Sequence, residues 1–177
     1  MTPEQITEKL NERFPDAGLK CQVDKGHAVA EVPLKGLLGF ITELKDDPEF
    51  RFDMMMDLTA VDWPHRKPRF DLVYHLYSVE HNHRLRVKAQ IEDGEVAPSA
   101  TGLWPIADAE EREVWDMYGI KFNGHPNLKR LLLYEEFKGH PLRKDYPYDK
   151  RQPLLEETWP VRDRQTHMDE GEEIHRA

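Results

Sequence analysis

The stretch FDLVYHLYSVEHNHRLRVKAQI, residues 70–91, decides the fold, because its apolar residues recur with the two-residue period of β-strands. The first half, 70–79, is apolar on both faces, which is typical of a central strand covered on both sides. After a polar turn, the second half alternates strictly, with apolar residues from Leu85 to Ile91 pointing one way. The residues pointing the other way are Arg84, Arg86, Lys88 and Gln90. The sequence therefore predicts two antiparallel strands joined by a short turn.

Two helices and a hairpin are predicted upstream of this stretch. Thr2-Pro3-Glu4-Gln5 has the form of a capping box with proline at the first helical position, and Pro15 ends the helix. Short apolar runs on either side of Asp24-Lys25-Gly26 indicate a hairpin, and Pro33 opens a second helix that ends before Pro48. The fold class expected is α+β, a mostly antiparallel sheet with helices packed on it.

A third strand is expected over residues 52–60. Its buried face is predicted to carry Phe52, Met54, Met56, Leu58 and Ala60. We interpret the run Met54-Met55-Met56 as filling of the core and the strand, in preference to a soft-metal site.

A charged helix is predicted to follow, with Asp108 as its N-cap and Glu111 three residues on. Arg112 and Asp116 stand one turn apart and predict an ion pair. With Glu113, this cluster also leaves open a general acid–base role, which we favour less.

The segment after this helix is rich in residues that shape the backbone. Gly119 is expected to end the helix in a left-handed conformation, and Leu131-Leu132-Leu133-Tyr134 to form a short buried strand. Gly-His-Pro occurs twice, at residues 124–126 and 139–141. Proline restricts the preceding histidine to extended backbone, and glycine permits angles closed to other residues. The motif predicts rigid corners or docking contacts, with a metal ligand or a proton relay as alternatives.

The charge is unevenly distributed along the 177 residues, whose formal net charge is −9. Residues 121–151 hold eight basic and four acidic side chains, which predicts a cationic belt on an acidic body. The overall negative charge argues against binding of nucleic acid. The single Cys21 fits a reducing compartment, and no segment has the length and apolarity of a membrane span. We expect a cytoplasmic chain that is soluble when separated from its partners.

We expect a domain over residues 1–146 and an extended, partner-binding arm over 147–177. Prolines at 147, 153 and 160 forbid long helices, and apolar residues such as Leu154 and Trp159 recur without a period. Packing of the arm on its own domain is the alternative. Residues 165–177 are expected to become ordered only on a partner.

Three stretches closely resemble the sequence of one family: EEREVWDMYGIKFNGHP (110–126), LKRLLL (128–133) and GHPLRKDYP (139–147). The family is the C (30-kDa) subunit of respiratory NADH:quinone oxidoreductase, also called complex I or NDH-1. The resemblance is specific over about residues 110–147 and compatible with the order of elements upstream.

The resemblance implies a docking subunit of the hydrophilic arm, peripheral on the cytoplasmic side of the inner membrane and attached to it only through the complex. It implies packing against the D (49-kDa-type) quinone-site subunit and neighbouring iron–sulfur subunits. FMN, iron–sulfur clusters and quinone would lie in those partners, and this chain would bind no cofactor and carry no catalytic residue. Partner docking is the role expected for Glu111, Arg112, Glu113, Asp116, Gly124, His125, Pro126, Arg130, Gly139, His140, Pro141, Arg143, Lys144, Asp145 and Trp159.

Other functions remain open at this stage. Membrane-bound hydrogenases, formate hydrogenlyase and ferredoxin-linked dehydrogenases use an equivalent subunit. A freestanding metal enzyme using His125 and His140, or an adaptor unrelated to respiration, belongs to a different class.

Overall fold

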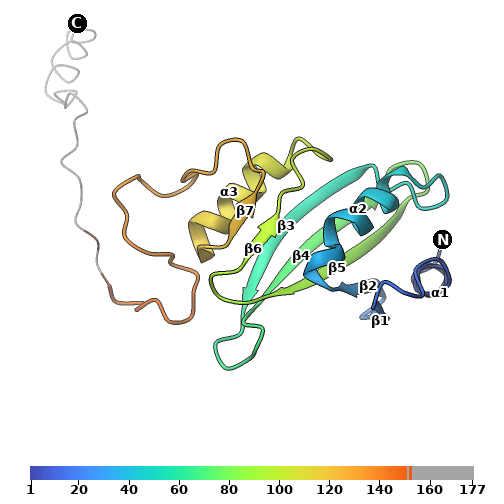
Figure 1. Ribbon diagram of the computed structural model, residues 1–177, viewed down its shortest axis with the longest axis horizontal. Coiled ribbons are helices and arrows are strands. Elements are labelled where there is room, and N and C mark those ends of the chain that lie inside the picture. The colour runs from blue at the N-terminus through green and yellow to red at the C-terminus, as the bar shows by residue number, and fades with distance from the viewer. Residues whose placement is uncertain (151, 153–177) are drawn as a thin grey trace, which may run out of the picture.

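The computed structural model describes residues 1–150 and residue 152, and confirms an α+β fold (Figure 1). The elements are α1 (Pro3–Arg13), β1 (Lys20–Asp24), β2 (His27–Val32), the 3-10 turn η1 (Leu34–Gly36), α2 (Leu37–Asp46), β3 (Met54–Asp62), β4 (Phe70–Ser78), β5 (His83–Ile91), β6 (Val96–Pro98), α3 (Ala107–Tyr118) and β7 (Lys121–Asn123). Among the described helices, none is long and apolar enough to cross a membrane.

The predicted N-terminal helix is confirmed down to its cap. The Thr2 hydroxyl accepts a hydrogen bond from the Gln5 amide, and the Gln5 side chain accepts one from the Thr2 amide. These bonds satisfy two amides that a helix start otherwise leaves without partners. Phe14 ends α1 and stacks edge-on against Phe40 of α2, at 5.0 Å between ring centroids. The capping box thus fixes where α1 meets the second helix.

The main sheet has the strand order β1-β2-β5-β4-β3. The β1–β2 hairpin and the antiparallel β3–β4 and β4–β5 pairs confirm the predicted meander. The β2–β5 pair is parallel, with Ala28 opposite Leu85, and these two strands are not joined by a short turn, so the sheet is mixed although mostly antiparallel. The physical reason is the crossover: the chain passes from β2 through α2 before it returns in β3, and a parallel pair requires such a crossover.

The predicted alternation of β3 is wrong at its start. A β-bulge between Met55 and Asp57 shifts the register, so Met55 is buried at 1% exposure while Met54 and Met56 are each 44% exposed. One extra residue in a strand reverses the face of every residue before it. Phe52, ahead of the strand, and Leu58 beyond the bulge are buried as expected. Only the middle methionine therefore fills the core.

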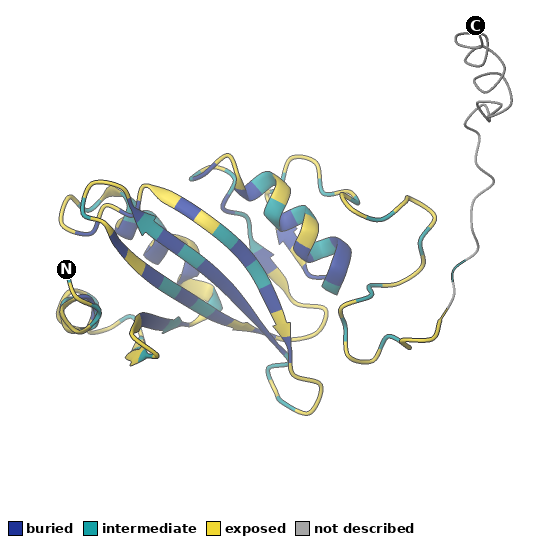
Figure 2. Cartoon of the chain, turned by 180° about the vertical axis from the view of Figure 1, so that it is seen from behind, coloured by how far each residue is buried: buried dark blue, intermediate teal, exposed yellow. Residues whose placement is uncertain are grey.

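One face of the main sheet packs against helices, and the other face does not. Alternate residues of β4 and β5, among them Tyr74 and Val87, share one hydrophobic core with residues of α1, α2 and α3. The opposite face carries Arg84, Arg86 and Lys88 of β5. Seen from behind, no described helix lies across these strands (Figure 2). All described helices therefore pack on one face of the sheet, as predicted.

The chain from Gly124 to Lys150 contains no helix or strand and runs beside α3 (Figure 1). The short buried strand expected over Leu131–Tyr134 is wrong: Leu131 is 39% and Leu132 61% exposed. We name this segment, residues 124–150, the docking loop, after the role predicted from the sequence for its residues. Because it lacks a hydrogen-bond ladder of its own, side chains from the rest of the domain must hold it.

Candidate functional site

Helix α3 is the element against which the docking loop lies. Its N-cap is Ile106 and not Asp108, which corrects the predicted capping box. Asp108 lies in the first turn instead, where its carboxylate stands 4.0 Å from the Arg112 guanidinium and 3.5 Å from Nε2 of His125. A carboxylate in the first turn is favoured by the helix dipole, which explains why Asp108 suits this position without capping it.

Glu111 is fully buried and does not cap the helix either. Its Oε1 accepts a hydrogen bond of 2.6 Å from the Ala100 amide, which ties the turn before α3 to the helix. Its Oε2 and the Tyr74 hydroxyl are both buried without a hydrogen-bond partner. Burial raises the pKa of Glu111, and burial followed by the Glu111 charge raises the pKa of Tyr74. Glu111 is thus a structural acid of the core, away from any exposed docking face.

Asp116 is the anchor of the docking loop. Its Oδ2 accepts the main-chain amides of Leu131, Leu132 and Leu133 at 3.0–3.1 Å, and its Oδ1 accepts Nη1 of Arg130 at 2.5 Å. Burial opposes the charge of this carboxylate, but the three amides and Arg130 together outweigh burial and lower its pKa. A buried carboxylate with this many donors is stably ionised. These amides donate their hydrogen bonds to Asp116 and not to a neighbouring strand, and for this reason the apolar run 131–134 forms no sheet.

The predicted Arg112–Asp116 ion pair is therefore wrong. Arg112 instead donates from Nε to the main-chain oxygen of Lys129 at 3.1 Å and from Nη2 to that of Arg130 at 2.9 Å. Arg130 lies over the rings of Trp115 and Phe137 and donates to the Phe137 main-chain oxygen at 2.5 Å. Planar guanidinium groups suit such combined stacking and forked donation. The two arginines hold the first half of the docking loop against α3.

The two Gly-His-Pro motifs are rigid corners, as predicted, and each histidine bonds to one end of α3. Gly124 and Gly139 have φ of 87° and 103°, which side chains disfavour. His125 places Nε2 3.1 Å from the Asp108 main-chain oxygen and accepts the Asn127 amide at Nδ1. His140 donates from Nδ1 to the Asp116 main-chain oxygen at 2.9 Å.

Both ring nitrogens of His125 are occupied by hydrogen bonds, so neither is free to bind a metal ion. A carbonyl only accepts, so Nε2 of His125 carries the proton, while its Nδ1 lone pair takes the Asn127 amide. Across residues 1–150 and 152, no group of three or more His, Cys, Asp or Glu side chains is arranged to hold a metal. The geometry supports the corner interpretation of Gly-His-Pro.

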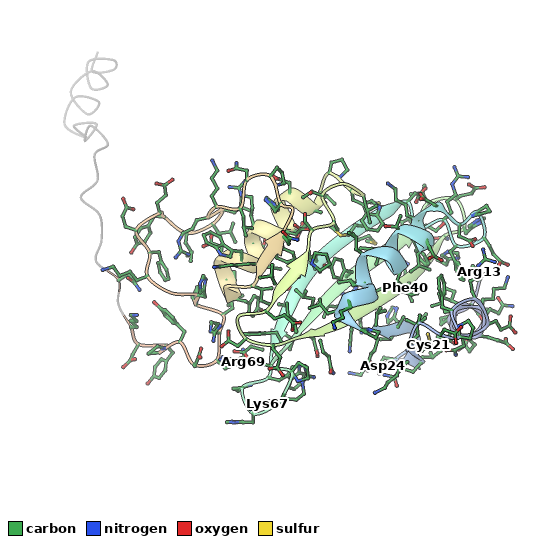
Figure 3. The ribbon with its side chains drawn as sticks, viewed as in Figure 1. Arg13, Cys21, Asp24, Phe40, Lys67 and Arg69 are labelled. Atoms are coloured by element: carbon green, nitrogen blue, oxygen red, sulfur yellow. The ribbon has the colours of Figure 1, made fainter. Side chains whose placement is uncertain are left out.

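An ion-pair network holds the second half of the docking loop. Arg143 bonds to Asp93 and to Asp145, and Asp145 accepts Nη1 of Arg69 at 2.9 Å. Asp62, buried at the end of β3, accepts two bonds from Arg69, and its Oδ2 also takes the amide of residue 144 at 2.7 Å. Figure 3 shows Arg69 at the end of the sheet nearest this part of the loop. Hydrogen bonds from Arg69 lower the pKa of both Asp62 and Asp145.

Sequence reasoning missed Arg69 and Asp62. Their signal is present, because opposite charges at 62 and 69 flank the turn between two strands that pair antiparallel. Helix α3 packs beside β3, the edge strand of the main sheet, which would otherwise offer free main-chain groups.

The exposed surface of the docking loop consists of other residues. Lys129, Lys138 and Lys144 are exposed, as are the apolar side chains of Leu132 (61%) and Leu142 (45%). Gly139 and Pro141 shape the second corner, Pro126 is exposed at the first, and Glu113 is exposed on α3. Trp159 and the predicted arm beyond residue 152 lie outside the described residues. The loop's arginines thus bond inward, whereas these three lysines, the leucines and the acidic side chains of Glu135, Glu136 and Asp149 face outward.

A family model described as respiratory-chain NADH dehydrogenase, 30 Kd subunit, matches residues 30–152. The chain is 42% identical over 144 residues to the C subunit of NADH-quinone oxidoreductase from Rhodobacter capsulatus, covering 81% of this chain and 72% of that protein. It is 45% identical over 140 residues to the same subunit of Citrifermentans bemidjiense, covering 78% and 86%. Against that of Caulobacter sp. (strain K31), identity is 50% over 115 residues, and the match spans about half (54%) of that protein.

A solved structure shares the fold. It is a chain from the structure of the membrane-bound sulfane sulfur reductase (MBS), described as an archaeal respiratory membrane complex. The TM-score is 0.69 at 27% identity, covering 82% of this chain and 85% of that one. The family match includes α3 and the whole docking loop, and the chain belongs to the family of the 30 Kd subunit of respiratory-chain NADH dehydrogenase.

Proposed function

We propose that this chain is a docking subunit, without a redox group of its own, in the hydrophilic arm of a proton-translocating NADH:quinone oxidoreductase. In the whole complex electrons would pass from NADH through FMN and iron–sulfur clusters to quinone, all held by partner subunits. The chain would sit on the cytoplasmic side of the inner membrane, against the D (49-kDa-type) subunit and neighbouring iron–sulfur subunits. Family membership supports this proposal.

The observation that carries the proposal is the docking loop itself. Residues 124–150 form no helix or strand, yet Asp116, Arg130, His140 and Arg143 fix them in place. A loop held in one conformation loses little entropy when a partner binds, which favours tight association. Its outward lysines and leucines combine positive charge with apolar area, so an acidic partner surface with apolar contacts fits them.

The donor set argues against a cluster held by this chain. An iron–sulfur cluster takes about four cysteine ligands, and the chain has one, Cys21, whose pKa is raised by burial. A raised pKa leaves the thiol protonated and poor as a ligand. The single cysteine thus supports the proposal that the redox centres lie in the partners.

Affinity purification of the tagged full chain from membranes tests this function. The D-type subunit and iron–sulfur subunits should co-purify with it. Reversal of charge at three outward lysines, Lys129→Glu, Lys138→Glu and Lys144→Glu together, should abolish co-purification and leave folding intact. Lys25→Glu is the matched control, because Lys25 is an exposed lysine of the β1–β2 turn, remote from the docking loop. Recovery of the chain without any respiratory subunit would overturn the proposal.

A second candidate is the equivalent subunit of a related membrane complex with a different electron donor. The similarity to a chain of the sulfane sulfur reductase structure favours it, because that complex is also a respiratory membrane complex. The same purification separates the two. Flavin- and NADH-binding subunits among the partners indicate NADH as donor, whereas a nickel-binding large subunit or a ferredoxin-linked module indicates the alternative.

A further inference from the structure

The open face of the main sheet carries a hollow that the docking loop does not use. The register places Asp57, His75 and Arg86 in one row across β3, β4 and β5. Tyr77 and Arg84 form the next row. Between the rows lies a hollow of about 250 Å³, lined by His27, Met56, Asp57, His75, Arg84 and Arg86.

The hollow lies at the end of the sheet away from the docking loop. Met56 and Arg84 stand near the starts of β3 and β5, whereas Asp62 and Arg69, which contact the loop, stand at the other end of the β3–β4 pair. Figure 2 shows this face without a helix over it. The hollow is thus a separate surface on the same domain.

The two arginines of the hollow differ from other arginines of the fold. Arg66, Arg69, Arg130 and Arg143 each bond to a carboxylate. Among the described residues, Arg84 and Arg86 have no carboxylate within salt-bridge distance, and Arg84 lies over the Tyr77 ring at 5.0 Å. Adjacent same-face residues on a strand stand about 7 Å apart, so a carboxylate between them can contact both guanidinium groups.

Besides the two arginines, the side chains that line the hollow are the Asp57 carboxylate, the imidazoles of His27 and His75, and the apolar side chain of Met56. The β-bulge turns the Met56 side chain away from the core, and this side chain is 44% exposed. The methylene stems of the arginines add apolar area below their charges. The floor is the main chain of Ala28, Leu76 and Leu85, whose side chains lie in the core on the other face of the sheet. Methionine, tyrosine and arginine are the residues enriched at protein interfaces. The pKa of His75 is lowered, first by burial and then by Arg86, which agrees with a site that disfavours further positive charge.

We infer that this hollow docks a segment of a neighbouring subunit that presents a carboxylate beside an apolar side chain. The carboxylate would bond to Arg84 and Arg86, and the apolar side chain would contact Met56 and the methylene stems of the arginines. A second copy of this chain fits less well, since it would bring the same pair of arginines. This inference rests on the proposed function, because it requires that the chain work inside a multi-subunit complex.

Zero-length cross-linking in the purified complex tests the inference. Arg84→Lys and Arg86→Lys place an amine where each guanidinium stood, and a carbodiimide joins that amine only to a carboxylate in direct contact. Arg51→Lys is the matched control, because Arg51 pairs with Glu80 of the same chain. The control should yield a link within the chain to Glu80. The two test variants should yield a link to an aspartate or glutamate of another subunit that the unmodified complex lacks.

The other outcomes overturn the inference. A link from position 84 or 86 to this chain's own acidic segment beyond residue 152, or to a second copy, would identify a different occupant. So would absence of any link while the Arg51→Lys control reacts. In each case the proposed function survives if the D-type subunit still co-purifies, so the two failures are distinguishable.

A second measurement needs no substitution in the hollow. Met56 should be oxidised several-fold more slowly in the assembled complex than in the isolated chain, since the docked segment would cover its sulfur. Trp63, 48% exposed at the far end of β3, gives the internal reference for each sample. Equal oxidation of Met56 in both states, relative to that reference, would contradict the inference even if the lysine variants failed to assemble.

Discussion

The main-chain oxygen of Asp116 accepts a hydrogen bond from Nδ1 of His140 at 2.9 Å. The carboxylate of the same aspartate accepts three consecutive amides and the Arg130 guanidinium. One residue of α3 therefore bonds to two stretches of the docking loop, around 131 and around 140. The loop conformation depends on this residue more than on any property of the loop alone.

Asp116→Asn should release the first half of the docking loop. The amide keeps the shape of the side chain but loses the charge, and it turns one acceptor oxygen into a donor. Removing one partner of such a buried pair costs about 3 kcal/mol. Hydrogen exchange should accelerate at the amides of residues 131–133. Glu113→Gln, a neutral change at an exposed position of the same helix, is the control and should alter neither stability nor exchange.

The contribution of Asp116 should depend on pH with a definite sign. Its folded-state pKa lies below the ordinary 3.8. The stabilisation is therefore present above that value and lost as pH falls through the folded pKa. The difference in melting temperature between the wild type and Asp116→Asn should shrink between about pH 5 and about pH 2. A difference that stays constant over this range would show that the carboxylate charge does not matter.

Replacing Gly119 or Gly124 by alanine distinguishes the free-energy cost of backbone strain from the cost of steric overlap. Both have φ near 85°, but a Cβ at Gly119 would meet the His140 ring at 2.7 Å, whereas one at Gly124 would meet nothing closer than 4.0 Å. Gly124→Ala should cost about 1–2 kcal/mol, the strain of a left-handed residue. Gly119→Ala should cost more, since the ring must also move. Chemical denaturation of both variants measures the difference, and equal losses would argue against close packing of His140 on α3.

Glu111→Gln should stabilise the folded chain at neutral pH, relative to the wild type. Burial raises the folded-state pKa of Glu111 above 4.5, so its favourable contribution is present at low pH and lost as pH rises through the folded value. The glutamine keeps an oxygen for the Ala100 amide and carries no charge. Glu111→Leu leaves that amide unpaired and should cost about 1–3 kcal/mol. Melting curves from acid to neutral pH compare the three proteins.

Arg143 and Lys144 should have different roles in spite of their shared charge. Arg143→Ala removes bonds to Asp93 and Asp145 and a cation–π contact with Phe70, and should cost about 1–2 kcal/mol. Lys144→Ala removes an exposed side chain and should leave the melting temperature unchanged. If Lys144→Ala weakens binding to the complex while its melting temperature equals that of the wild type, Lys144 acts at the interface with the partner.

Local signals in the sequence predicted local structure well. The capping box at Thr2 and the strict alternation of Leu85–Ile91 each report on neighbours in the chain, and both are confirmed. The cap at Ile106 has no such signal, because its side chain makes no capping bond, and Asp108 next to it is the stronger sequence candidate.

Long-range contacts overrode the remaining predictions. Residues 131–134 are apolar and suggest burial, but the amides of residues 131–133 are taken by a carboxylate fifteen or more residues away in sequence. The bulge at Met56 breaks an alternation that the composition alone supports equally in either register. Of the predicted docking residues, Glu111 is buried in the core, and Asp116, Arg130 and Arg143 hold the loop. Their part in binding a partner stays a prediction.

The parallel pairing of β2 with β5 has a consequence for biosynthesis. Ala28 pairs with Leu85, so the first hairpin emerges from the ribosome long before the strand beside which it must lie. Until β5 has been translated, the inner edge of β2 is free to pair with any other nascent chain. Closure of this sheet must wait for β5, a late and non-local step of the kind that slows folding.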